Sequence, residues 1–140
     1  MKKPVPYVQN GIGMSEFLID TNLLIYHTAG VAECVSFIEK AIREDSFNIS
    51  IITEIEFLGW NMHTEEGFEK CKQLIELARI VPLDESVAAK AVELRRKSSI
   101  KLADAVIAAT ALVYSLKLAT RNKEDFRSIE ELEIYDPFDE

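Results

Sequence analysis

The segment from Leu102 to Leu116 constrains the fold of this 140-residue chain more than any other. It reads LADAVIAATALVYSL, and Asp104 is the one charged residue between Lys101 and Lys117. A helix that is apolar on almost every face is central and buried. A buried carboxylate is strongly unfavourable alone, so Asp104 must be paired, protonated or bound to a cation. A salt bridge with Lys101 is the structural alternative to a cation.

Short apolar runs alternate with helical patterns along the chain. We expect strands at 17–19, 47–52, 80–83, 117–120 and 132–135. Helical segments are expected at 23–27, 31–43, 53–62, 65–78, 85–97, 102–116 and 123–128. Such alternation is typical of a parallel sheet with helices on both faces. The predicted fold class is α/β, a three-layer α/β/α sandwich with a central, mostly parallel sheet.

Residues 1–13 do not share this pattern. They contain two prolines and two glycines, and we interpret them as an N-terminal extension, disordered or preceding an alternative start. Residues 14–140 are interpreted as one domain, a normal size for a single core. No signal peptide and no apolar run of about 20 residues is seen, so we expect a cytoplasmic protein with no membrane contact. Cys34 and Cys71 form no CxxC pair and are expected to be buried thiols.

Three further carboxylates follow predicted strands. Asp20 comes directly after 17–19, Glu56 lies in the first turn of the helix after 47–52, and Asp125 follows 117–120. In open α/β sheets, ligand sites form at the carboxyl ends of the strands. Each acid also has a structural explanation: Asp20 as a turn residue, Glu56 in a capping box with Thr53, and Asp125 as a surface helix start.

Glu54 competes with Glu56 for this position. Two residues apart on a helix, their side chains differ in direction by about 200°, so only one can face the site. Glu56 has Ile55 and Phe57 beside it and Trp60 four residues later, which places it on a largely apolar face. We therefore predict Glu56, and Glu54 stays the alternative.

Clustered carboxylates at one sheet edge predict a cation site. Several acids close together cannot all stay ionised without a counter-cation, and carboxylate oxygens suit Mg²⁺ or Mn²⁺. The two histidines, His27 and His63, offer no zinc-ligand spacing. The net charge of −8 argues against a large basic platform for nucleic acid, although bound cations would offset an acidic site.

The order of these motifs resembles the PIN domains and, within them, the VapC-type toxins of prokaryotic toxin–antitoxin pairs. The matching stretches are FLIDTNLLIY at 17–26, ISIITEIEFLGW at 49–60 and KLADAVIAATALVYSLKLATRNKEDF at 101–126. The resemblance implies that residues 14–140 form a PIN-like nuclease domain. Its expected activity is that of an Mg²⁺- or Mn²⁺-dependent endoribonuclease, the toxin of a type II toxin–antitoxin pair.

The resemblance also implies roles for individual residues. The acids that would be both catalytic and metal-binding are Asp20, Glu56, Asp104 and Asp125. The polar residues that would support them are Asn22, Thr120 and Asn122, and Arg121 beside them can contact phosphate. The implied partners are an RNA substrate, a cognate antitoxin and a second copy of the chain in a homodimer.

Two other interpretations keep part of this picture. One is a housekeeping RNA-processing or structure-specific nuclease with the same site, and the other is a non-catalytic PIN-like module that binds a metal or a protein. A phosphatase or a phosphorelay receiver also uses an Asp at a strand end. Neither of these two classes explains Glu56 and Asp125 together, and no DxD follows the first strand.

Overall fold

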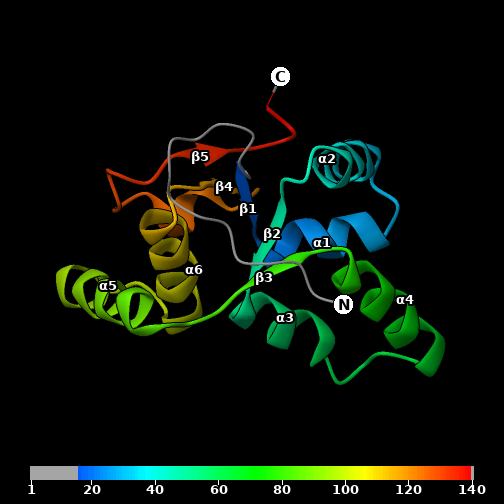
Figure 1. Ribbon diagram of the computed structural model, residues 1–140, viewed down its shortest axis with the longest axis horizontal. Helices are drawn as coiled ribbons and strands as arrows, with labels where there is room; N and C mark the ends of the chain where they lie inside the picture. Colours follow the sequence, from blue (N-terminus) through cyan, green and yellow to red (C-terminus); the bar gives the residue numbers. More distant parts are fainter. Residues whose placement is uncertain (1–15, 140) are drawn as a thin grey trace.

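Five parallel strands form a single sheet in the computed structural model, which describes residues 16–139 (Figure 1). The strands are β1 (Phe17–Ile19), β2 (Phe47–Ser50), β3 (Arg79–Val81), β4 (Lys117–Ala119) and β5 (Ile134–Tyr135). Their order is β3-β2-β1-β4-β5, and every neighbouring pair is parallel. The predicted parallel sheet is confirmed. The extension predicted at 1–13 lies outside the described residues.

Helices cover both faces of this sheet. They are α1 (Thr21–Thr28), α2 (Ala32–Arg43), α3 (Ile51–Leu58), α4 (Glu65–Glu76), α5 (Glu85–Lys97) and α6 (Leu102–Val113), with a short 3-10 helix, η1 (Lys123–Phe126). Figure 1 shows α5 and α6 on one side of the strands and α1, α2 and α4 on the other. The predicted three-layer α/β/α sandwich is therefore confirmed.

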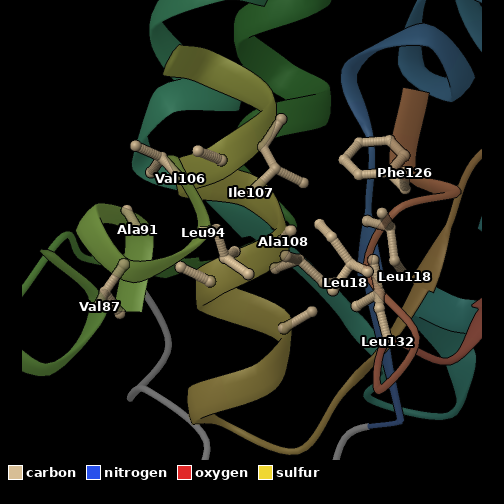
Figure 2. Packing of buried hydrophobic residues seen from close by; sticks show 14 of the residues in the cluster. Leu18, Val87, Ala91, Leu94, Val106, Ile107, Ala108, Leu118, Phe126 and Leu132 are labelled. Carbon is tan, nitrogen blue, oxygen red and sulfur yellow. The ribbon is translucent and has the colours of Figure 1, made fainter. Parts of the chain in front are cut away.

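The two layers follow from the alternation of side chains along the strands. Leu18 and Leu118 face the core formed with α5 and α6, where Figure 2 shows them opposite Ala108. Ile19 and Ala119, one position later, face the core formed with α1, α2 and α4. Because β1 and β4 pair in register, both strands end at the same edge of the sheet.

Helix α6 is the central, buried helix that its sequence predicts, except that its first turn is not fully buried. The side chains from Ala105 to Ala111 are all buried, and the many alanines let α6 approach the sheet and α5 closely. Asp104 lies one residue before this stretch and is only half-buried. The buried helix is confirmed, but Asp104 itself is less buried than expected, because the helix begins at the rim of the core.

Helix α3 begins earlier than expected. Strand β2 ends at Ser50, whose hydroxyl oxygen accepts a hydrogen bond from the Ile52 N–H at 3.1 Å and caps the helix. Thr53 lies inside α3 and is fully buried, so the predicted capping box between Thr53 and Glu56 does not form. Glu56 belongs to the second helical turn, not the first. Its position therefore needs another explanation.

Both cysteines are buried and free, as predicted. Across residues 16–139, no helix has both the length and the apolar character needed to cross a membrane.

Candidate active site

Asp20 is the most buried of the four predicted acids, with 5% of its surface exposed. It follows β1 directly and caps α1, because its Oδ1 accepts a hydrogen bond from the Thr21 N–H at 2.8 Å. Its Oδ2 accepts hydrogen bonds from the Thr120 hydroxyl at 2.7 Å and the Asn22 amide at 2.9 Å. Asp20 is thus both a helix cap and a side chain fixed at the end of the central strand.

Thr120 and Asn22 connect the ends of β1 and β4. The Thr120 oxygen is buried and also accepts hydrogen bonds from the Asn22 amide at 3.2 Å and the Asn122 N–H at 3.0 Å. Asn22 Oδ1 accepts a hydrogen bond from the Arg121 N–H at 3.2 Å. The four supporting residues named from the sequence therefore lie in one network beside Asp20.

The Arg121 side chain extends away from this network. Its guanidinium lies 3.8 Å from the centre of the Phe138 ring and 6.0 Å from that of Tyr26. At this distance over the Phe138 ring, the guanidinium makes a cation–π contact.

Glu56 is held at the site by a hydrogen bond from another segment. Its Oε1 accepts a hydrogen bond from the Thr21 hydroxyl at 2.8 Å. The Thr21 oxygen also lies 3.2 Å from the Thr53 hydroxyl oxygen, which is buried in α3. Thr21 was not predicted as a site residue. The available signal was its place between Asp20 and Asn22 in the DTN motif, since a hydroxyl there can reach across to α3.

Asp104 and Asp125 approach the site from the other layer. Asp104 is in the first turn of α6, and Asp125 is an exposed residue of η1. Both line a cleft of about 280 Å³ that the α5–α6 loop closes on one side. Lys101 lines the same cleft, but no ion pair joins it to Asp104 among the described residues. The salt-bridge explanation of Asp104 is therefore not supported.

The four acids influence one another electrostatically. The pKa of Asp104 is raised to about 6, most strongly by burial and then by the negative charges of Asp125, Asp20 and Glu56, in that order. Lys101 lowers the pKa of Asp104, as the smallest effect. Burial also raises the pKa of Asp20, and the charge of Glu56 adds to this against the hydrogen bonds. Acids from four separate segments therefore form one negatively charged cluster.

The cluster suits a hydrated divalent cation by its chemistry and charge. Among residues 16–139, no three His, Cys, Asp or Glu side chains stand close enough together to ligate one metal ion directly. The cluster nevertheless consists of oxygen donors, and the Asp104 carboxyl holds its proton more tightly because neighbouring charges repel. Mg²⁺ usually keeps several water ligands and needs few carboxylates. An open arrangement of this kind fits such an ion.

Comparison of the sequence with known proteins finds one matching family and a curated relative. Residues 17–132 match the PIN domain family. The chain is 33% identical over 120 residues to "Ribonuclease VapC10" of Mycobacterium tuberculosis, covering 82% of this chain and 89% of that protein.

Solved structures share the fold. A chain of a toxin–antitoxin complex from Klebsiella pneumoniae superposes with a TM-score of 0.71 at 28% identity, covering 88% of this chain and 98% of that chain. A chain of DNA-bound VapBC from Salmonella typhimurium gives a TM-score of 0.80 at 20% identity over 89% and 99% of the two chains, which supports the fold alone. With the match to the family over most of its length, this chain belongs to the PIN-domain proteins.

Proposed function

We propose that this protein is a metal-dependent endoribonuclease and the toxin of a type II toxin–antitoxin pair. The observation that carries the proposal is the convergence of four carboxylates from distant segments: Thr120 holds Asp20, Thr21 holds Glu56, and Asp104 and Asp125 line one cleft. Burial and the charges of the other three acids together raise the pKa of Asp104 to about 6. A fold does not gather such charges for stability, and perturbed carboxylates in a cleft are typical of catalytic sites. The similarity to a protein named as a ribonuclease supports the substrate class.

The proposed ligands of Mg²⁺ or Mn²⁺ are Asp20, Asp104, Asp125 and Glu56, directly or through water. A divalent cation bound there supplies a water of lowered pKa and offsets charge on the phosphate. Asp20 is the fixed member, because Thr120 and Asn22 orient its carboxylate.

Glu56 is proposed to orient the attacking water and accept its proton. It is exposed, so it can reach solvent, while its hydrogen bond with Thr21 fixes one carboxylate oxygen. Asn122, whose N–H donates a hydrogen bond to Thr120, is proposed to support the site, and the guanidinium of Arg121 is proposed to bind a phosphate of the substrate.

The test is cleavage of RNA by Asp20→Asn and Asp104→Asn in Mg²⁺ or Mn²⁺. Both variants should lose cleavage by about 100-fold or more while their circular dichroism stays that of the folded protein. Glu69→Gln, an exposed acid on α4, is the matched control and should keep full activity. Folded variants with undiminished cleavage would disprove the site assignment.

The toxin role adds a protein partner. A related chain was solved in a toxin–antitoxin complex, and we propose a cognate antitoxin for this protein. Expression of this chain alone should arrest growth, and expression of Asp104→Asn should not. Growth that continues with active enzyme in the cell would instead favour a housekeeping nuclease.

We further propose a homodimer that forms through exposed apolar side chains at the α3–α4 turn. This α3–α4 apolar surface consists of Ile55, Trp60, Met62 and Phe68, which are 36–68% exposed. Exposed apolar side chains gathered in one region indicate an interaction surface. The loop that joins α3 and α4 lies away from α5 and α6 in Figure 1, so a partner there leaves the α5–α6 loop uncovered.

A further inference from the structure

A run of basic residues lies at the end of α5 and in the loop that follows. The segment LRRKSSIKLA at 94–103 contains no acid, in a chain of net charge −8. Its four cations are all exposed to solvent, and we call them the α5–α6 basic run: Arg95, Arg96, Lys97 and Lys101. Arg95, Arg96 and Lys97 complement the dipole of α5 at its C-terminal end. Positive charge concentrated on the surface of an acidic protein also attracts anionic ligands.

Most of this charge is not neutralised within the described chain. Lys97 lies 3.4 Å from the carboxylate of Glu93, one turn earlier on α5. Arg95, Arg96 and Lys101 form no ion pair with any residue between 16 and 139. Three cations are therefore available to an anionic ligand.

One member of the basic run, Lys101, lines the same cleft as Asp104 and Asp125, and Arg95 and Arg96 lie in the last turn of α5, just before this loop. Ser98, Ser99 and Lys101 form one wall of the 280 Å³ cleft, and Asp104 and Asp125 line it as well. Serine hydroxyls and a lysine ammonium on one wall are hydrogen-bond donors for phosphate and ribose oxygens. A strand that reaches the acids through this cleft would pass the basic run on its way.

The opposite flank of the site offers less free positive charge. Lys123 lies 2.6 Å from the carboxylate of Asp139 and 3.8 Å from that of Asp136. Arg121, as described above, is stacked on Phe138 of the same segment. A phosphate on this side would compete with Asp136 and Asp139, whereas a phosphate at the basic run would not.

We propose that Arg95, Arg96 and Lys101 bind the phosphates of the RNA substrate on one side of the cleaved bond, so that the strand enters through the α5–α6 cleft. The inference rests on the proposed ribonuclease function and adds the surface along which the RNA strand reaches the site. Phosphates supply most of the affinity for nucleic acids, and each neutralised phosphate releases a counter-ion. The three cations provide this attraction beside a cluster that would otherwise repel RNA.

The experiment compares two triple variants with the same loss of charge. The first is Arg95→Gln, Arg96→Gln and Lys101→Gln together. The control is Lys40→Gln, Arg43→Gln and Lys72→Gln, exposed cations of α2 and α4 in the other helical layer. Affinity for a fluorescein-labelled, mixed-sequence single-stranded RNA is measured by anisotropy in EDTA, over a range of NaCl concentrations. Cleavage is measured separately with Mn²⁺.

The first variant should bind RNA about tenfold more weakly, and its affinity should depend less steeply on salt, by about 2 in the log–log slope for three lost contacts. The control should keep the wild-type slope. In cleavage, KM should rise about tenfold and by more than kcat falls, because Arg95 and Arg96 bind substrate outside the cleft, whereas Lys101 also acts on Asp104 within it.

Three outcomes would overturn the proposal. The first is an RNA affinity and salt dependence that stay unchanged in the first variant, and the second is an equal loss of RNA affinity in the control variant. The third is a polyglutamate peptide that binds more tightly than RNA and depends on the same three residues. The last would assign the surface to an acidic protein segment. A wild-type chain that binds RNA through these residues but cleaves none would remove the proposed reaction and leave the binding surface in place.

Discussion

At the scale of single residues, the carboxylates of the site oppose one another. Asp104 lies half-buried at the start of α6, and its pKa is raised to about 6 by burial and by the charges of Asp125, Asp20 and Glu56. A carboxyl whose pKa is raised on folding is ionised at the expense of stability at neutral pH. The site is therefore expected to be strained until a cation offsets its charge.

Replacing Asp104 with Asn should make the metal-free protein more stable. The variant removes a charge that three neighbours repel, and the gain should be about 1 to 2 kcal/mol after allowance for solvent screening. Urea denaturation in EDTA at neutral pH measures it. Glu69→Gln, far from the cluster, should change the free energy of unfolding by less than about 0.5 kcal/mol. A destabilised Asp104→Asn variant would contradict the repulsion argument.

Glu56 and Glu54 should differ sharply in their effect on catalysis. Glu56 is hydrogen-bonded to Thr21 and raises the pKa of both Asp20 and Asp104. Glu56→Gln is expected to lower kcat by about 100-fold or more, the usual contribution of a proton acceptor. Glu54→Gln is the matched control on the same helix and should stay within about threefold of the wild type, less than such a contribution. The reverse order of effects would assign the role to Glu54.

The sequence predicted which acids would gather but not how each is held. Asp20 followed a clear apolar run, so its place at the strand end was predictable. The Thr21–Glu56 hydrogen bond was not, because it joins segments 35 residues apart and depends on how α3 packs against α1. The half-burial of Asp104 was also missed, since a helical pattern does not tell where the sheet ends beneath the helix.

At the scale of elements, a side-chain hydrogen bond connects the start of α5 with the end of α6, in addition to their apolar packing. The Tyr114 hydroxyl, just after α6, donates a short hydrogen bond to Asp84, which caps α5 through the Val87 N–H. The hydrogen bond from Tyr114 lowers the pKa of Asp84, and the same bond raises the pKa of Tyr114 to about 12. Helix α5 ends in the basic run, and α6 carries Asp104 in its first turn.

Tyr114→Phe should destabilise the protein by about 1 kcal/mol at neutral pH, because it removes a hydrogen bond to a charged, partly exposed group. Asp84 contributes stability above its unfolded pKa of about 4 and loses it as the pH falls through its lowered folded pKa. Tyr114 contributes stability at pH values below its unfolded pKa of about 10, and this contribution is lost as the pH rises through its folded pKa of about 12. Urea denaturation of both proteins from acid to alkaline pH should show a difference that shrinks at both ends. A difference independent of pH would exclude this hydrogen bond as the cause.

The start of α3 shows why element boundaries were harder to predict than elements. Phe47 to Ile52 reads as a strand rich in β-branched residues, yet the last two residues of that run are helical. Ser50 caps the helix, and an N-cap is a local hydrogen bond that outweighs a weak propensity. The order and type of the elements were predicted because they depend on the repeated spacing of apolar residues over many positions.

At the scale of the whole molecule, the α3–α4 apolar surface should control association. Met62→Glu places a charge where a second copy is proposed to pack, and should shift the sedimentation of the protein to that of a monomer. Val92→Glu, 59% exposed on α5 in the other layer, is the matched control and should leave the dimer intact.

Trp60 reports on the same event, because it is the one tryptophan of the chain and is 58% exposed. Its emission should shift to shorter wavelength as dimers form with rising protein concentration, because the ring leaves water. A wild-type protein that sediments as a monomer at all concentrations would contradict the proposed homodimer.

The strand order has a consequence for how such an enzyme is made. β1 lies in the middle of the sheet, and its second neighbour, β4, is supplied by residues 117–119. Asp20 receives its hydrogen bond from Thr120, 100 residues later in the chain. A nascent chain on the ribosome therefore carries Asp20 and Glu56 long before Thr120 and Asp125 exist to complete the site. We therefore expect a nascent chain to cut no RNA until residues 117–125 have been synthesised, and fragments that end before this segment to be inactive.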